Sequence, residues 1–319
     1  MDPDRPARGN VPGRLKRCLM KPAGALLAIT LAFIPVARAQ PVELKKVGSD
    51  RFVFFAGDKE LATLMPDAWQ GNLNILSPKT NMLCGVNWPH FLLYSEGKWL
   101  TDRVESEGLK LVGFDLIKTS GPVIGYTGRW QFRDYCASSE CHFAWHDATN
   151  AMQFHLIRTK IEILKDLPDI SGAWTEFMTT ENSYSTVAAK ISGGKVITMD
   201  VSGTGKNANM HHWDGYDLDD HGWISIYGAR KGQQACVAMV PLQCDPGPIH
   251  PRINNGHVDN IELHMLDARK QNLLKRGQTF VLEYLLIVAP DQADWKWIEL
   301  AAQNGRIFIG QNPDLFHCP

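Results

Sequence analysis

Apolar and polar residues alternate along much of the chain with a period of two, which is the pattern of β-strands with one buried and one wet face. In PVIGYTGRWQF, residues 122–132, the large apolar side chains occupy even positions and the polar ones odd positions. In VDNIELHML, residues 258–266, Ile261, Leu263 and Met265 alternate with polar residues in the same way. The run TFVLEYLLIVA at 279–289 is more uniformly apolar, so it predicts a central strand covered on both faces.

The other strand signals are short runs separated by Gly, Pro, Asn and Asp. They lie at 51–56, 91–95, 110–117, 152–164, 173–179, 195–201, 223–227 and 235–240. One helix is expected in DQADWKWIELAAQNG, with Asp291 as its N-cap and Gly305 where it stops. The pattern predicts an all-β protein: a large antiparallel two-sheet sandwich of the supersandwich type, with a short C-terminal helix.

The first 39 residues have the layout of a secretory signal peptide. An apolar run at 23–37 follows basic residues and precedes Ala-Arg-Ala, a small-x-small cleavage site after Ala39. The run is too short for a membrane span, and Met20 could be the true start. We therefore expect an exported protein, periplasmic or secreted, without a membrane span after cleavage and with one large β-sandwich domain over residues 40–319.

Removal of the predicted signal peptide makes the chain acidic. Residues 1–39 hold 7 of the 33 Lys and Arg and 2 of the 34 Asp and Glu, which leaves 26 basic and 32 acidic residues and a net charge of −6. Binding of nucleic acid requires a basic surface, so nucleic acid is not expected as a partner. The sequence also lacks a complete phosphate loop, a G-x-S-x-G elbow and an H-E-x-x-H motif.

Six of the seven cysteines follow the predicted cleavage site, and an even number in an exported protein favours disulfides. Two local pairs would staple hairpin ends and leave a third pair: Cys136–Cys141, Cys236–Cys244 and Cys84–Cys318. The run C-x4-C-H-x3-H at 136–146 could instead be drawn as a zinc tetrahedron, although its spacing is uncommon and an oxidising compartment favours a disulfide.

A resemblance to a known superfamily comes from three segments. SGPVIGYTGRWQF, HGWISIYG and LLKRGQTFVLEYLLIVAP follow one another with a long polar middle. This cadence resembles the large β-sandwiches of galactose-mutarotase-like proteins, which include aldose epimerases and domains of polysaccharide lyases. The resemblance would cover most of residues 45–290 and implies a β-sandwich that acts on carbohydrate. No catalytic motif of that superfamily matches residue by residue, so the resemblance assigns no catalytic residue.

The stretch NANMHHWDGYDLDDHGW, residues 207–223, concentrates three histidines, four aspartates, a tyrosine and two tryptophans. His211, His212 and Tyr216 can donate or accept protons, so they are catalytic candidates. Trp213 and Trp223 offer flat apolar faces on which a pyranose ring can stack, although many tryptophans only pack in cores.

The aspartates of this stretch are also candidate calcium ligands. Asp217, Asp219 and His221 have the spacing of the first EF-hand ligands, but the twelfth position is Gly228 instead of Glu, which excludes a true EF-hand. A different Ca²⁺ site could use Asp214, Asp217 and Asp219, or Asp214 could orient an imidazole. The alternative is that these aspartates form turns. No cofactor is required by the predicted chemistry.

A second cluster lies in PGPIHPRINNGH, residues 246–257, which reads as a loop between two strands. Functional side chains concentrate on such loops because a rigid sheet positions them. His250 is a catalytic candidate there, and Arg252 is a candidate clamp for a carboxylate because its guanidinium donates two parallel hydrogen bonds. Asn254 and His257 are candidate substrate-binding residues.

These residues favour a carbohydrate-active enzyme, with β-elimination on a uronic-acid-containing polysaccharide as the leading hypothesis. His212 or Tyr216 would act as base or acid, while Arg252, His250 and Asn254 would neutralise the sugar carboxylate. The net charge of −6 opposes a polyanionic substrate unless basic residues near the two clusters offset it. A sugar epimerase or mutarotase would use similar groups, and a non-catalytic sugar-binding envelope protein remains the alternative from another class.

Overall fold

The structure is a computed structural model. It describes residues 42–67, 72–75, 84–86, 92–95, 98–99, 110–118, 120–121, 123–131, 135–145, 152–178, 184–201, 210–212, 216–230, 233–245, 247–254, 260–266, 272–290 and 292–311. The chain divides into two compact units, Met1–Pro35 and Val36–Pro319. The predicted signal peptide lies outside the described residues, and all described elements belong to the second unit.

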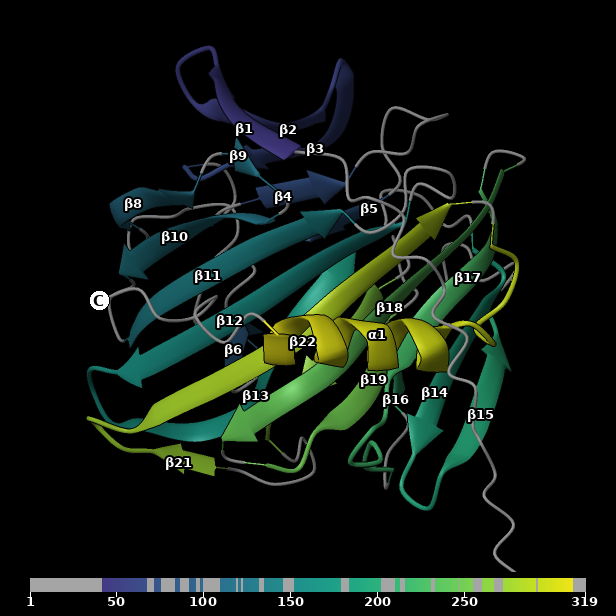
Figure 1. The fold of residues 1–319 in the computed structure, drawn as a ribbon. Helices are drawn as coiled ribbons and strands as arrows, with labels where there is room; N and C mark the ends of the chain where they lie inside the picture. Colours follow the sequence, from purple (N-terminus) through teal and green to yellow (C-terminus); the bar gives the residue numbers. More distant parts are fainter. Residues whose placement is uncertain are drawn as a thin grey trace, which may run out of the picture. The chain divides into compact units, whose positions relative to one another are not determined.

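Thirteen of the described strands form one antiparallel sheet, here called sheet A (Figure 1). Its main order is β16-β19-β20-β13-β5-β4-β3-β2-β1-β9, with β6 and β21 paired to β13 and β7 paired to β6. Its strands are β1 (Val42–Val47), β2 (Arg51–Ala56), β3 (Lys59–Met65), β4 (Asn72–Ile75), β5 (Cys84–Val86), β6 (Leu92–Ser95), β7 (Lys98–Trp99), β9 (Ser120–Gly121), β13 (Leu167–Met178), β16 (Met210–His212), β19 (His250–Asn254), β20 (Asn260–His264) and β21 (Asn272–Leu274).

The other nine described strands form a second antiparallel sheet, sheet B, in the order β15-β14-β17-β18-β22-β12-β11-β10-β8. The strands are β8 (Lys110–Lys118), β10 (Val123–Gln131), β11 (Tyr135–Trp145), β12 (Gln153–Ile163), β14 (Thr186–Ile191), β15 (Lys195–Asp200), β17 (Ile224–Arg230), β18 (Gln233–Asp245) and β22 (Thr279–Pro290). The apolar run at 279–289 is the central strand β22, as predicted, because it pairs with both β12 and β18.

The inner faces of the two sheets share one apolar core, which confirms the predicted two-sheet sandwich. Phe54 and Leu64 contribute to this core from sheet A, and Ile157 and Leu282 contribute from sheet B. A tilted ring contact also connects the sheets, since Phe114 of β8 lies 5.0 Å from Phe52 of β2, measured between ring centroids. Within sheet B, Phe114 also lies 5.6 Å from Tyr126 of β10.

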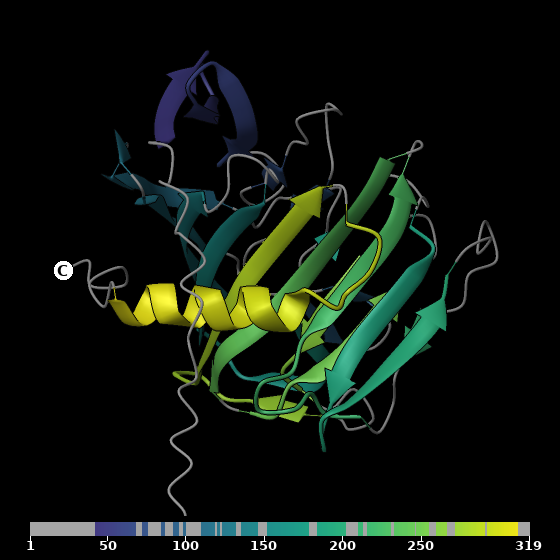
Figure 2. The ribbon, with the colours of Figure 1, turned by 45° about the vertical axis from the view of Figure 1, so that its right-hand side comes forward.

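The predicted C-terminal helix exists, but it begins later and ends later than expected. Helix α1 (Ile298–Gln311) runs through Gly305 instead of stopping there. A Cβ at Gly305 would lie 2.3 Å from Cδ2 of Leu285 on β22, so the glycine allows close packing of the helix on the sheet. The helix covers the outward face of sheet B, where it packs against buried residues of β12, β14, β18 and β22 (Figure 2).

The predicted local disulfides are wrong. Cys236 and Cys244 are not joined by a disulfide and lie eight residues apart on one strand, β18, so their Cα atoms are about 26 Å apart. Cys136 and Cys141 likewise share β11, about 16 Å apart. A disulfide needs Cα atoms within about 7 Å. Cys84 lies on β5, and Cys318 lies outside the described residues.

Three of the four ligands of the alternative zinc site, Cys136, Cys141 and His142, are placed by their backbones on β11, and the fourth, His146, lies outside the described residues. As to a membrane, the described part of the chain contains no helix with the length and hydropathy that a span requires.

Candidate acid–base site on sheet A

Four neighbouring strands of sheet A bring polar residues into one row. His212 of β16 lies opposite Arg252 of β19. Arg252 lies opposite Glu262 of β20, and Glu262 lies opposite Glu176 of β13. Residues directly opposite each other in antiparallel strands share one face of the sheet. The two sequence clusters at 207–223 and 246–257 therefore contribute two adjacent hydrogen-bonded strands, β16 and β19, which bring their polar residues opposite each other.

This row lies on the outward face of sheet A. Ile261 and Leu263 of β20 belong to the core between the sheets, so the alternate residues Glu262 and His264 project away from that core. Both residues are nevertheless buried, with 1% and 2% of their surface exposed. Nε2 of His264 lies 2.7 Å from Oε2 of Glu262. The buried carboxylate and the buried imidazole are thus hydrogen-bonded to each other.

A second carboxylate–imidazole pair lies beside the first. His250 of β19 is directly opposite His264 of β20, and its Nδ1 lies 2.8 Å from Oδ1 of Asp217. The side chains of His250 and Asp217 are 20% and 46% exposed, so this pair is more accessible than the first. Imidazoles and carboxylates are the common general acids and bases in enzymes, and two adjacent pairs can move protons on a bound ligand.

The position of Asp217 is fixed by backbone hydrogen bonds to both sheets. The N–H of the next residue, Leu218, donates to the carbonyl of Ile249, which immediately precedes His250. The carbonyl of Asp217 accepts from the N–H of Ser192, next to β14, at 2.9 Å. The segment 216–222 therefore connects the end of β14 in sheet B to the start of β19 in sheet A, which brings Asp217 to His250.

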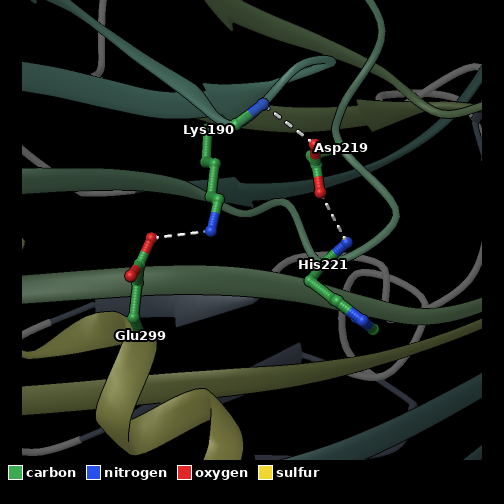
Figure 3. Close-up of polar contacts among 5 residues, drawn as sticks. Lys190, Asp219, His221 and Glu299 are labelled. Atoms are coloured by element: carbon green, nitrogen blue, oxygen red, sulfur yellow. Dashed lines mark hydrogen bonds and ion pairs between the residues drawn. The ribbon is translucent and has the colours of Figure 1, made fainter. Parts of the chain in front are cut away.

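Asp219 stabilises this turn and has no role in the pair (Figure 3). Its carboxylate accepts hydrogen bonds from the N–H groups of His221 (3.2 Å) and Gly194 (3.0 Å). The first of these, together with the second and nearby positive charge, lowers the pKa of Asp219 despite some desolvation. Nearby, Lys190 donates to Glu299 of α1 at 2.8 Å. The turn interpretation is thus confirmed for Asp219.

The calcium prediction finds no support in the described residues. Asp217 is engaged by His250, Asp219 is engaged by backbone N–H groups, and Asp214 lies outside them. Within the described ranges, no three His, Cys, Asp or Glu side chains come together as a metal-binding group.

The remaining predicted site residues are placed to different extents. Tyr216 is described and 40% exposed. His211, His212, Arg252 and Asn254 are placed by their backbones in β16 and β19, but their side chains lie outside the described residues. Trp213 and His257 lie outside them entirely. The predicted loop at 246–257 is partly wrong, because His250–Asn254 is the strand β19.

Trp223 lies on the other side of the molecule's sandwich, away from this site. None of its surface is exposed, and its indole packs on Trp295, 5.2 Å away between ring centroids. It belongs to the apolar cluster beneath α1. A fully buried indole offers no face to a sugar, so Trp223 is a packing residue in this structure.

Sequence reasoning missed Glu262 and His264. The alternation in VDNIELHML predicts that they lie on the polar side of a strand, and such a side is expected to face solvent. Their two-residue spacing on a strand, E-x-H, was the available signal, because such residues share a face and can hydrogen-bond. Only the structure shows that this face is buried and that His250 lies opposite His264.

Comparisons with known proteins give distant structural likeness and no sequence relative. No protein-family model matches the chain, and no curated protein matches it. Solved structures overlap with it in part. The GH36 alpha-galactosidase of Geobacillus stearothermophilus, in complex with 1-deoxygalactonojirimycin, aligns at 9% identity and TM-score 0.38, over 64% of this chain and 30% of that one.

Two further structures are similar to the same degree. The alpha-galactosidase of Lactobacillus brevis aligns at 9% identity and TM-score 0.37, over 64% of this chain and 29% of that one. The protein Slr1438 of Synechocystis aligns at 8% identity and TM-score 0.31, over 80% of this chain and 96% of that one. The chain thus spans about a third of the length of the alpha-galactosidases. At these TM-scores the overlap gives no residue correspondence and does not indicate what this chain binds.

Proposed function

We propose that the protein is an exported carbohydrate-active enzyme that cleaves a uronic-acid-containing polysaccharide by β-elimination on the outward face of sheet A. The observation that carries this proposal is the buried Glu262–His264 pair, 2.7 Å between Nε2 and Oε2, directly beside Arg252 and His250 in the sheet register. Burial of ionisable groups costs folding free energy, so such a pair is retained most readily where it has a chemical role.

β-Elimination needs three kinds of group, and the predicted site residues include the residue types for each. A base removes the proton α to the sugar carboxylate, an acid protonates the leaving oxygen, and a cation or neutral donors stabilise the enolate-like charge. His212, His250 and Tyr216 are the candidate acids and bases. Arg252 and Asn254 are the candidate partners of the carboxylate, and Trp213 and His257 remain predicted contacts to the sugar rings.

A sugar epimerase or mutarotase is the second candidate. The partly exposed His250–Asp217 pair favours it, because mutarotation needs a base for the anomeric hydroxyl and an acid for the ring oxygen but no sugar carboxylate. Both candidates place the ligand on the same face of sheet A, and they differ in whether Arg252 is required.

The proposal is tested by measuring whether the purified protein converts either of two panels of substrates. Ultraviolet absorbance of the unsaturated product reports elimination on uronic-acid polysaccharides, and polarimetry reports mutarotation of free aldoses. We expect elimination that falls steeply in Arg252→Ala. The matched control is Arg158→Ala, which removes an arginine paired with Glu283 on sheet B at 3.0 Å and should retain activity.

Mutarotation without elimination would contradict the lyase hypothesis and support a sugar epimerase or mutarotase. Sugar binding without turnover on either panel would contradict both and favour a non-catalytic binding protein.

A further inference from the structure

We propose that Asp217 holds His250 with its proton on Nδ1, so that Nε2 of His250 is the nitrogen that exchanges a proton with the substrate. This inference rests on the proposed function and deepens it, because it assigns one of the candidate groups to a definite atom. It also gives Asp217, a predicted metal ligand, the role of a positioning residue.

The first step is the geometry of the pair. Nδ1 of His250 lies 2.8 Å from Oδ1 of Asp217, the distance of a charge-assisted hydrogen bond. An ionised carboxylate can only accept hydrogen bonds, so the proton between these atoms belongs to Nδ1. In a neutral imidazole the other nitrogen is then an acceptor. Nε2 of His250 is therefore the nitrogen whose lone pair can accept a proton.

The second step is the contrast with the neighbouring histidine. His264 uses Nε2, not Nδ1, toward its carboxylate partner Glu262. The ring nitrogen that does not face the carboxylate is therefore Nδ1 in His264 and Nε2 in His250. The two imidazoles lie opposite each other on adjacent strands, but they are held by different nitrogens and differ in exposure. The partly exposed His250 is the one that a ligand can reach.

The third step is that the Asp217 backbone is held on both sides. Its carbonyl accepts hydrogen bonds from the N–H of Ser192 at 2.9 Å and from the Oγ of Ser192 at 3.2 Å. The following N–H, of Leu218, bonds to the carbonyl of Ile249 at 2.9 Å, one residue before His250. Groups held by such supports keep a catalytic side chain in one orientation without reorganisation during the reaction.

The proton transfers balance in the proposed elimination. Nε2 of His250 takes the proton α to the uronate carboxylate, and the C–H electron pair forms the new carbon–carbon double bond. The bond to the leaving oxygen breaks, and that oxygen receives a proton from an acid, for which Tyr216 or His212 is the candidate. The positive charge on His250 is stabilised by Asp217, and the proton then returns to water.

The decisive measurement is the tautomer of His250, read from nitrogen-15 NMR of the imidazole at a pH above the ordinary histidine pKa of about 6.5. The His250 signals are assigned by their loss in His250→Gln. We expect protonated Nδ1 and unprotonated Nε2 in the unaltered protein. In Asp217→Ala the proton should move mainly to Nε2, and kcat should fall by up to about 100-fold with little change in KM. Asp220→Ala, which removes an exposed carboxylate of the same turn, should change neither.

The outcomes separate this inference from the proposed function. A protein that turns over no sugar while His250 carries its proton on Nδ1 would contradict the proposed function and support the tautomer assignment. An active enzyme whose His250 is protonated on Nε2 would overturn the inference and leave the proposed function standing. If Asp217→Ala does not fold, the spectrum of the unaltered protein alone decides the assignment.

Discussion

The outward faces of the two sheets arise from the same alternation along the strands, but they are buried in different ways. On sheet B the outward residues are apolar, such as Trp223, Ala238 and Ile287, and helix α1 covers them. On sheet A the outward residues of β20 are Glu262 and His264, which are equally buried but ionisable. The first kind of burial stabilises the fold by about 25 cal/mol per Å² of apolar surface, whereas the second kind costs desolvation. Under the proposed function, the outward face of sheet B serves stability and that of sheet A serves chemistry.

The largest expected effect comes from breaking the buried pair on sheet A. Glu262→Ala leaves His264 buried without its carboxylate, so we expect a loss of about 3–5 kcal/mol in the free energy of unfolding. We also expect kcat to fall by up to about 100-fold, because the loss of Glu262 disturbs His264, which lies opposite the candidate acid–base residue His250. Denaturant unfolding and the turnover assay measure the two quantities. Unchanged kcat in the folded fraction would remove Glu262 from the site.

The same comparison shows what the sequence could and could not predict. The two-sheet sandwich, the central strand β22 and the existence of α1 follow from period-two alternation and from one amphipathic segment near the C-terminus. The disulfides failed because spacing alone did not show that Cys236 and Cys244 share one strand. The buried pair was missed because alternation predicts which residues share a face but not what covers that face. Register between distant strands, such as His250 opposite His264, is set by tertiary pairing.

On sheet B, Trp223→Ala should cost about 3–5 kcal/mol of stability, since it removes a fully buried aromatic side chain beneath α1. Under conditions where the variant is folded, kcat and KM should stay close to their original values. Thermal unfolding and the turnover assay on the folded fraction check this, with Trp223→Phe as the milder control. A selective loss of kcat in Trp223→Ala would mean that the two faces are not functionally distinct.

A third, smaller effect concerns His155 in the core between the two faces. Burial lowers the pKa of His155 to about 3 from an ordinary value of 6.5, and its Nε2 lies 3.2 Å from Oε1 of Gln153. The unfolded chain therefore binds this proton first as the pH falls. Above pH 6.5 the imidazole is neutral in both states, so it does not affect the free energy of unfolding. As the pH falls from 6.5 toward 3, the free energy of unfolding decreases by up to about 1.4 kcal/mol per pH unit, because only the unfolded chain binds the proton.

His155→Gln, which keeps a polar side chain but does not titrate, should flatten this part of the pH profile. Urea unfolding midpoints between these pH values give the measurement. Parallel profiles for the two proteins would show that folding does not lower the pKa of His155.

The smallest effect is expected at the Lys190–Glu299 ion pair, which joins β14 to the helix on sheet B (Figure 3). Half of the Glu299 side chain is exposed, at 51%, so solvent screens the pair. Glu299→Gln should lower stability by no more than about 1 kcal/mol and lose that effect in high salt. Thermal melts at low and high ionic strength measure it, and a larger loss would show that α1 depends on this contact more than on its apolar packing.

The most direct test of the central claim is the double variant Glu262→Met/His264→Leu. Replacement of a buried ionisable pair by apolar residues of similar volume is often neutral or stabilising. If the pair exists for chemistry, the double variant should unfold at the same or higher denaturant concentration than the original protein and yet lose turnover on every substrate that the original converts. A double variant that is stable and fully active would contradict the account.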